Sequence, residues 1–225
     1  MDTLRPFTDA ATVARYAEDT PRKVPGYADL HRMAMLLLAE RAPQHSDILV
    51  YGAGGGLGLK AFGEAQPGWR LVGVDPSAEM LDLARETLGP LLTRVDLRQG
   101  YMEAAPQGPF EGAACLLTLH FLQRDERLAV LRDIRRRVKP GASFVIAHHS
   151  YPEGSEPIDW LARSMMFADR GVQDVAGASR SAQMMSKQLP ILSAVEEEAL
   201  LEQAGFSEIA LFYASFSFRG WVATA

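Results

Sequence analysis

Apolar residues recur along the chain with two different periods, and these periods predict alternating helices and strands. In the segment Tyr27 to Arg41 they lie three and four positions apart, which is the spacing of an amphipathic helix. Short runs rich in Val, Leu and Ile, at Asp47 to Tyr51 and at Arg70 to Val74, predict strands. Strands that alternate with helices in this way are typical of a parallel sheet covered on both faces.

The rest of the chain continues this alternation and then changes it at the C-terminus. Further elements are predicted as strands at Arg94 to Arg98, Gly112 to Thr118 and Ala142 to His148, and as helices at Ala78 to Leu88 and Asp125 to Val138. Ser193 and Glu196 form a capping-box pattern that begins a helix.

Two closely spaced strands end the chain, Glu208 to Tyr213 and Phe216 to Ala223. Two intervening residues are too few for a parallel crossover, so these strands form an antiparallel hairpin. The predicted fold class is therefore α/β: a Rossmann-like sheet of seven mostly parallel strands with an antiparallel C-terminal hairpin and helices on both faces.

The 225 residues are enough for one such domain, and we interpret 1–225 as a single domain. Residues 1–42 are expected to form an N-terminal helical cap. Residues 150–192, rich in Met, Gly and Ser, follow the fifth predicted strand. An insertion at the carboxyl end of a strand is where a substrate lid would lie, so we predict a lid insertion there.

Composition and charge then exclude several classes of protein. The chain is 48% hydrophobic and 23% charged with a net charge of -5, which is ordinary for a globular protein and argues against a dedicated nucleic-acid binder. The longest apolar runs are far shorter than the roughly 20 residues of a membrane helix. The first residues of the sequence are acidic and include Pro6, so they lack the pattern of a secretory signal. Cys115 is the single cysteine of the sequence. We therefore predict a cytoplasmic protein without membrane association.

A glycine cluster directly after the first predicted strand carries the candidate chemistry. Gly52, Gly54 and Gly56 follow the predicted strand and form a tight turn that leads into a helix. Such a turn lets ligand atoms approach bare backbone N–H groups. Asp75 ends the next strand, where a carboxylate can accept both hydrogens of a ribose diol. Together these features predict a nucleoside-containing cofactor.

The glycine spacing argues against a dinucleotide. The pattern G-x-G-x-x-G fails from Gly52, where the last position is Leu57, and from Gly54, where it is Leu59. S-adenosylmethionine has no pyrophosphate and tolerates a looser loop. A nicotinamide dehydrogenase is therefore the weakest of the hypotheses considered.

At this point the chain resembles the class I S-adenosylmethionine-dependent methyltransferases. The resemblance rests on the glycine loop, Asp75, the Lys139-Pro140-Gly141 segment and Ala204-Gly205-Phe206. It implies a methyltransferase with S-adenosylmethionine as cofactor and a homodimer as the assembly. The cofactor-binding residues expected on this basis are Tyr51, Gly52, Ala53, Gly54, Gly56, Asp75, Pro76, Met80, Tyr101, Met102 and Leu117.

Within that superfamily the chain is most similar to the carboxy-S-adenosylmethionine-dependent tRNA wobble-uridine transferases. The residues that carry this likeness are Arg22 to Tyr27, Thr118 to Leu122, Arg180-Ser181 and Phe216 to Ala223. The likeness implies that Arg180 contacts the extra carboxylate of the cofactor and that the segment with Arg22 and Tyr27 closes over the active site. Three polar positions of the family are changed, at Val50, Tyr101 and Leu116.

Histidines at the ends of two predicted strands are candidate general bases. His148 and His149 end the fifth strand, and only one of them can face the site because side chains alternate along a strand. His120 follows the fourth strand. We select His148 and His120 as catalytic candidates. No ligand spacing in the sequence indicates a metal.

Three hypotheses remain at this stage. The leading one is a methyltransferase acting on a small molecule. The second keeps the fold but uses carboxy-S-adenosylmethionine on a tRNA. The third, based on the changed residues Val50 and Leu116, is a protein that binds the nucleoside without catalysis.

Overall fold

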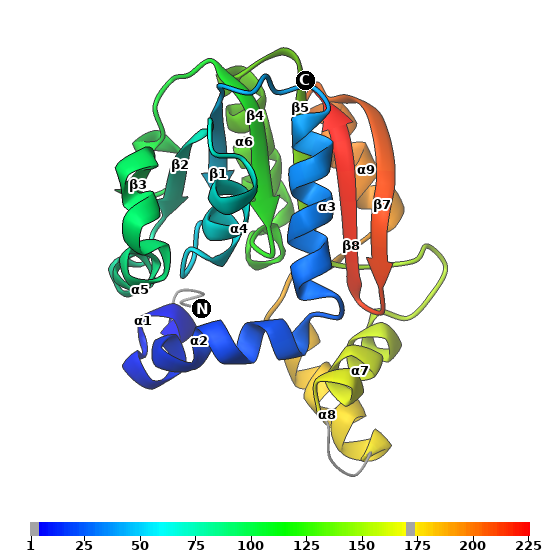
Figure 1. Ribbon diagram of the computed structural model, residues 1–225. Coiled ribbons are helices and arrows are strands. Elements are labelled where there is room, and N and C mark those ends of the chain that lie inside the picture. Colours follow the sequence, from blue (N-terminus) through cyan, green and yellow to red (C-terminus); the bar gives the residue numbers. More distant parts are fainter. Residues whose placement is uncertain (1–4, 170–173) are drawn as a thin grey trace.

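A twisted sheet runs through the molecule, with helices on both of its faces (Figure 1). The computed structural model describes residues 5–169 and 174–225, so parts of the predicted cap and insertion lie outside the described residues. The strands are β1 (Asp47–Tyr51), β2 (Arg70–Asp75), β3 (Val95–Gln99), β4 (Phe110–Leu116), β5 (Val138–Tyr151), β6 (Leu192–Ser193), β7 (Ser207–Ser215) and β8 (Phe218–Thr224).

The strand order is β3-β2-β1-β4-β5-β8-β7, and β6 pairs only with the end of β5. The pairs among β1 to β5 are parallel, whereas β8 runs antiparallel to both β5 and β7. The prediction of a mostly parallel sheet with an antiparallel C-terminal hairpin is therefore confirmed. The two-residue strand β6 is an addition to the seven strands expected.

Nine helices and three 3-10 turns are found in the described part of the chain. They are α1 (Arg5–Thr8), α2 (Ala10–Lys23), α3 (Tyr27–Ala39), α4 (Leu57–Ala65), α5 (Ala78–Leu88), η1 (Gly89–Arg94), η2 (Met102–Ala104), η3 (Leu119–Phe121), α6 (Arg124–Arg137), α7 (Pro157–Ala168), α8 (Val175–Ser186) and α9 (Ala194–Gln203). None of these helices has both the length and the apolar character needed to cross a membrane.

The alternation of side chains along β1 divides the core into two layers. Ile48 and Val50 pack into the layer with α3, α4 and α5, whereas Leu49 and Tyr51 pack into the layer with α6 and α9. Burial on both sides explains why β1 is a continuous apolar run rather than an alternating one. A third, small cluster around Leu161 holds α7 against α8.

Local capping signals begin two helices where the sequence predicts them. The Ser77 side chain accepts a hydrogen bond from the Met80 N–H at the start of α5. Ser193 and Glu196 form a reciprocal capping box at the start of α9. Each bond satisfies an N–H group that the first turn of a helix leaves unpaired.

The C-terminal hairpin turns two residues later than predicted. The turn residues are Phe216 and Ser217 rather than Ala214 and Ser215, and Ser215 pairs with Phe218 across the hairpin. Ser217 is held at the turn by hydrogen bonds to Ser164 and His149, which the sequence pattern does not reveal. Tertiary contacts therefore set the position of this turn.

Two groups of helices lie beyond the carboxyl ends of the parallel strands. Figure 1 shows α1 and α2 crossing below that edge of the sheet, with α7 and α8 beside the far end of α2. The segment 150–192, predicted as a lid insertion, contains both α7 and α8. The same edge carries the glycine loop.

Candidate functional site

A cavity of about 680 Å³ opens at the carboxyl ends of β1, β2 and β4, and we call it the glycine-loop cavity. This size lies within the usual range for a small-molecule or cofactor site. Its lining residues are Phe7, Tyr16, Tyr51, Gly52, Gly54, Asp75, Pro76, Met80, Tyr101, Met102, Glu103, Leu116, Leu117, Thr118, Phe121, Leu122, Gln123, Glu126, Ala129, Val130 and Asp133.

The loop after β1 has a conformation and a fit that require glycine. Gly52 has a φ of 76°, and a Cβ on it would lie 1.9 Å from Thr118 Oγ1. Gly54 has a φ of 51°. The Gly52 N–H donates to the Val74 carbonyl at 2.9 Å, which anchors the loop to β2. The loop therefore presents bare backbone to the cavity.

The Asp75 carboxylate organises the cavity at the end of β2. Its Oδ2 accepts a hydrogen bond from the Gly54 N–H at 2.8 Å, and its Oδ1 accepts one from the Ser77 N–H at 3.0 Å. Burial raises the pKa of Asp75, and these two hydrogen bonds oppose that rise. A carboxylate has about four acceptor positions, so each oxygen keeps capacity for a ligand hydroxyl.

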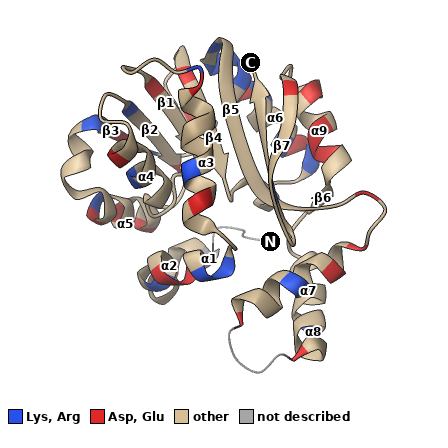
Figure 2. Ribbon diagram, turned by 45° about the vertical axis from the view of Figure 1, so that its right-hand side comes forward, with Lys and Arg blue, Asp and Glu red and all other residues tan. Residues whose placement is uncertain are grey.

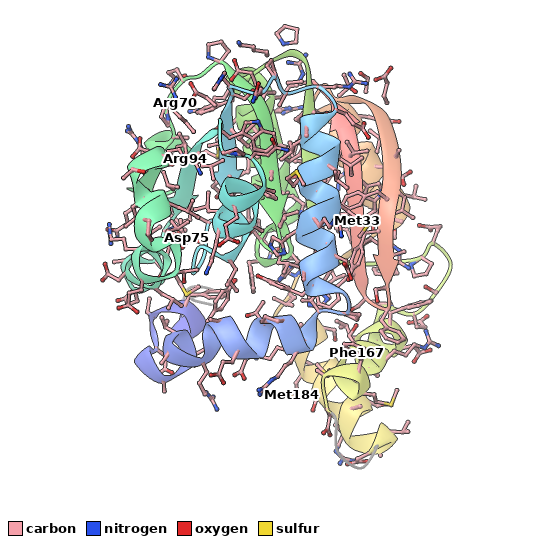
Figure 3. The ribbon with its side chains drawn as sticks, in the orientation of Figure 1. Met33, Arg70, Asp75, Arg94, Phe167 and Met184 are labelled. Atoms are coloured by element: carbon pink, nitrogen blue, oxygen red, sulfur yellow. The ribbon has the colours of Figure 1, made fainter. Side chains whose placement is uncertain are left out.

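Figure 3 shows Asp75 at the edge of the sheet that faces α1 and α2, with Arg70, the first residue of the same strand, at the opposite edge. The N-terminal helices cover the cavity there. Phe7 packs edge-on against Phe121 at a ring distance of 5.2 Å, and its carbonyl accepts a 2.7 Å hydrogen bond from Ser77 Oγ. These contacts fasten α1 to η3 and to the start of α5.

Tyr16 of α2 forms a second part of the cover. A Cβ on Gly54 would lie 3.1 Å from the Tyr16 hydroxyl oxygen, so the tyrosine lies over the glycine loop. Burial and the nearby Asp75 charge raise the pKa of Tyr16 to about 12. Phe7 and Tyr16 were missed by the sequence interpretation, because no local motif links them to the loop, whereas Thr118 was noted only as part of the segment Thr118 to Leu122 that carries the family likeness.

The charged side chains in the described lining of the glycine-loop cavity are all acidic, and one of them, Asp133, is ion-paired with Arg136. This lining contains four carboxyl groups, those of Asp75, Glu103, Glu126 and Asp133, and no Lys, Arg or His. Such a cavity favours a positively charged ligand.

Comparison with known proteins connects this geometry to a family. Residues 48–141 match a family described as a methyltransferase domain. The chain is 28% identical, over 99% of its length, to a carboxy-S-adenosyl-L-methionine synthase of Chromohalobacter salexigens, of which it covers 85%.

Two solved structures share the fold. A Nostoc punctiforme protein assigned as an O-methyltransferase matches with a TM-score of 0.70 and 18% identity, over 96% of this chain and 61% of that one. Human N-acetylserotonin methyltransferase, solved with S-adenosylmethionine, matches with a TM-score of 0.60 and 14% identity, over 99% of this chain and 62% of that one. The chain thus spans about three fifths of the length of these two proteins.

The chain contains a methyltransferase domain at residues 48–141 and is similar over most of its length to class I S-adenosylmethionine-dependent methyltransferases. The residues of the methyltransferase fit this cofactor, because the bare backbone at Gly52 and Gly54 and the free acceptor positions of Asp75 meet in one cavity of sufficient size. The curated relative is named for making carboxy-S-adenosylmethionine, whereas the likeness seen in the sequence was to transferases that use it on tRNA.

Most of the cofactor-binding residues expected from the sequence lie together in the methyltransferase. All of them line the glycine-loop cavity except Ala53 and Gly56. Ala53 is buried in the core, and its N–H donates to the Val74 carbonyl. A Cβ on Gly56 would lie 3.0 Å from the Cα of Ala84, so this glycine allows α4 and α5 to approach each other. These two residues support the loop on its core side and do not line the cavity.

The two candidate catalytic histidines do not line the glycine-loop cavity. His148 is completely buried on the α9 side of the sheet, with its Nε2 3.0 Å from Glu197 Oε1. His120 belongs to η3 and is buried, and its ring lies against that of His149 at 4.8 Å. Neither side chain contacts the cavity in this conformation, so we do not assign either as a base.

The residues predicted to close the site are also outside the glycine-loop cavity. Arg22 is exposed on α2. Tyr27 contacts His31 with tilted rings 4.4 Å apart, behind the glycine loop. Arg180 lies on the outside of α8 with its side chain 71% exposed and 3.7 Å from Asp174 Oδ2. Arg180 does not line the glycine-loop cavity in this arrangement of the chain, and its contact with a cofactor carboxylate stays a prediction.

Proposed function

We propose that this methyltransferase transfers the methyl group of S-adenosylmethionine to a small-molecule acceptor. When bound, S-adenosylmethionine supplies an electrophilic methyl group on a positively charged sulfur. The observation that carries the proposal is the charge of the glycine-loop cavity, which is lined by four carboxyl groups and by no basic side chain among its described residues. That charge favours the sulfonium form of the cofactor and opposes an additional carboxylate.

Each part of the cavity has a role in this proposal. The bare backbone of Gly52 and Gly54 lies beside the amino-acid end of the cofactor, and Asp75 accepts hydrogen bonds from the ribose hydroxyls. Tyr101 and Met102 flank the adenine. Phe7 and Tyr16, on the N-terminal helices, cover the cavity and exclude water from it. Because methyl transfer is an in-line displacement, alignment and exclusion of water are the main contributions that these residues make.

A second candidate is chemistry on a carboxylated cofactor, including transfer to tRNA. The name of the Chromohalobacter salexigens relative supports a link with carboxy-S-adenosylmethionine. The exposed position of Arg180 and the acidic cavity argue against it. Competition binding tests the choice: we expect S-adenosylmethionine to bind at least about tenfold more tightly than its carboxylated form, and the reverse preference would favour this second candidate.

Charge at the surface also favours a small acceptor over RNA. Basic and acidic residues are interspersed along the helices in Figure 2, and the net charge of the chain is -5. An RNA-binding protein usually has a clustered basic surface. A cytoplasmic location and a homodimer are also part of the proposal, to be tested by cell fractionation and by analytical ultracentrifugation.

One experiment tests the class of acceptor. The purified protein is incubated with S-adenosylmethionine labelled in its methyl group and with separate small-molecule and RNA fractions of a bacterial extract. We expect the label to enter the small-molecule fraction and to be lost with the Asp75→Asn variant. Label that enters only RNA would contradict the proposal, and no transfer to either fraction, although S-adenosylhomocysteine binds, would favour the non-catalytic hypothesis.

A further inference from the structure

Tyr16 of α2 lies against the glycine loop at three of its glycines. A Cβ on Gly54 would lie 3.1 Å from the Tyr16 hydroxyl oxygen, and a Cβ on Gly55 would lie 3.0 Å from its Cδ1 atom. Tyr16 also lines, together with Gly52, a small cavity of about 20 Å³ on the core side of the loop. The tyrosine therefore covers the part of the loop that, in the proposed function, lies beside the amino-acid end of the cofactor.

The charge of the glycine-loop cavity opposes one group of that cofactor. S-adenosylmethionine carries a sulfonium and an ammonium group, which suit an acidic lining, and a carboxylate at its amino-acid end, which does not. No Lys, Arg or His occurs among the described residues that line the cavity. The carboxylate therefore needs neutral hydrogen-bond donors, because burying a charged group without partners costs free energy.

Three backbone N–H groups of the glycine loop already have partners within the protein. The N–H groups of Gly52 and Ala53 both donate to the Val74 carbonyl, at 2.9 and 3.0 Å. The Gly54 N–H donates to Asp75 Oδ2 at 2.8 Å. Because these bonds hold the loop in place, a donor for the cofactor carboxylate is needed from a side chain beside the loop.

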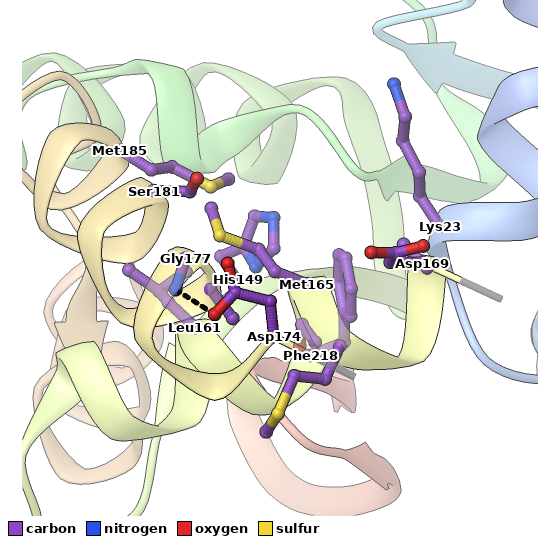
Figure 4. Close-up of a pocket in the computed structure, with 14 residues that line it drawn as sticks. Lys23, His149, Leu161, Met165, Asp169, Asp174, Gly177, Ser181, Met185 and Phe218 are labelled. Carbon is purple, nitrogen blue, oxygen red and sulfur yellow. Dashed lines mark hydrogen bonds between the residues drawn. The ribbon is translucent and has the colours of Figure 1, made fainter. Parts of the chain in front are cut away.

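Other candidate donors near the loop and on α2 are directed elsewhere. The Thr118 hydroxyl donates to the Leu116 carbonyl at 3.0 Å. Lys23, at the end of α2, lines a second cavity of about 640 Å³, between α7, α8 and the ends of β5 and β8. Figure 4 shows Lys23 there on the same side as Asp169. Arg22 is exposed, and neither of these two basic residues lines the glycine-loop cavity.

The Tyr16 hydroxyl has the protonation state that such a donor needs. Burial and the charge of Asp75 raise the pKa of Tyr16 to about 12, so the hydroxyl keeps its proton near pH 7. A side-chain hydrogen bond with Thr20 opposes that rise. A hydrogen bond lowers the pKa of a tyrosine when the phenol oxygen accepts it, so we assign the Thr20 hydroxyl as the donor. The hydrogen of Tyr16 is then available to a ligand in the glycine-loop cavity, which Tyr16 lines.

We propose that the Tyr16 hydroxyl donates a hydrogen bond to the amino-acid carboxylate of S-adenosylmethionine, and that this neutral contact takes the place of a basic residue in an acidic cavity. The inference rests on the proposed function, because it assigns a partner to one group of the proposed cofactor. A hydroxyl binds the carboxylate without adding positive charge, so the cavity keeps its attraction for the sulfonium. The contact also links cofactor binding to α2, since the bound carboxylate holds this helix over the loop.

A pair of matched ligands isolates this contact. Decarboxylated S-adenosylmethionine keeps the nucleoside, the sulfonium and the amino group of S-adenosylmethionine and lacks only the carboxylate. We expect Tyr16→Phe to weaken the binding of S-adenosylmethionine by about tenfold or more, the size expected for a hydrogen bond to a charged group. Binding of the decarboxylated ligand should not change in this variant, which also shows that the variant is folded. Isothermal titration calorimetry measures both affinities.

Two further variants serve as controls. Tyr151→Phe removes the same hydroxyl from a tyrosine that does not line the glycine-loop cavity, and it should bind both ligands as the wild type does. Asp75→Asn should weaken the binding of both ligands, since both carry the ribose. Unchanged affinity of Tyr16→Phe for S-adenosylmethionine, or an equal loss for the two ligands, would overturn the inference.

The same titrations separate this inference from the proposed function. If the wild type binds both ligands and Asp75→Asn weakens them while Tyr16→Phe weakens neither, the cofactor site stands and only the contact of Tyr16 is wrong. Failure of the wild type to bind either ligand would contradict the proposed function, and the inference with it.

Discussion

The backbone N–H of Gly54 donates a 2.8 Å hydrogen bond to Asp75 Oδ2 and thereby joins the loop after β1 to the end of β2. The bond fixes the carboxylate beside the bare backbone of the loop. The two features that were expected to bind a nucleoside cofactor, the glycine turn and the acidic residue, therefore form one unit. A change at either residue should affect both the loop geometry and cofactor binding.

Asp75→Asn should weaken binding of S-adenosylhomocysteine by about ten- to a hundredfold, the range for losing hydrogen bonds to a charged group. The amide keeps one acceptor oxygen but replaces the other with a donor that faces the Gly54 or the Ser77 N–H. Isothermal titration calorimetry measures the change. Asp82→Asn removes the same charge from the exposed face of α5, and its affinity should match the wild type. Equal affinities for all three proteins would remove Asp75 from the site.

Gly52→Ala should lower the free energy of unfolding by about 2 kcal/mol or more and abolish tight cofactor binding. The new Cβ would collide with Thr118 Oγ1, and the residue would keep an unfavourable positive φ. Gly154→Ala has a similar φ of 70° but no atom within 4 Å of its Cβ, so it should cost only about 1 kcal/mol. Urea unfolding of both variants measures the difference, which would be zero if the contact with Thr118 were unimportant.

Acidification should destabilise the protein through its buried histidines. The folded-state pKa of His149 is lowered to about 3 from an ordinary 6.5, so only the unfolded chain takes up this proton between those values. The stability that His149 contributes is therefore complete above about pH 6.5 and is lost as the pH falls towards 3, by at most about 1.4 kcal/mol per pH unit. Burial lowers the pKa of His120 in the same direction.

Urea unfolding at about pH 7 and pH 5 compares the wild type with His149→Phe. The variant should lose less stability between the two pH values, and the remaining loss should come in part from His120. An identical loss in both proteins would show that His149 does not titrate as described.

Glu197→Gln should destabilise the fold by about 3 kcal/mol, because it leaves the buried Arg127 guanidinium without its charge partner. Arg127 also donates to the Pro190 carbonyl and so connects α6 with the segment before α9. Glu208→Gln removes one partner of an exposed pair with Arg41 and should cost less than about 1 kcal/mol. Chemical denaturation measures the change in the free energy of unfolding for both variants. Equal changes would show that burial does not make the pair of Arg127 and Glu197 more important than the exposed pair.

Patterns that are local in sequence could be predicted well. The apolar run of β1, the Ser77 cap and the Ser193 capping box depend on residues a few positions apart, and each predicts its element correctly. The glycine loop and Asp75 follow strands that end at the same edge of a parallel sheet, so their meeting could be inferred from topology.

Long-range packing decided what the sequence did not predict. Side-chain alternation indicated that only one of His148 and His149 faces a site, but not which one, because both neighbouring layers are buried. Tyr16 reaches the glycine loop only through the path of α2 across the edge of the sheet. The position of Ser217 at the hairpin turn depends on Ser164 of α7, which is 53 residues away in the chain.

A crystal structure of the complex with S-adenosylhomocysteine tests the central claim most directly. The account predicts that the nucleoside occupies the glycine-loop cavity, with both ribose hydroxyls on the Asp75 carboxylate and the adenine beside Tyr101 and Met102. A nucleoside bound outside the glycine-loop cavity, or inside it without contact to Asp75, would contradict it.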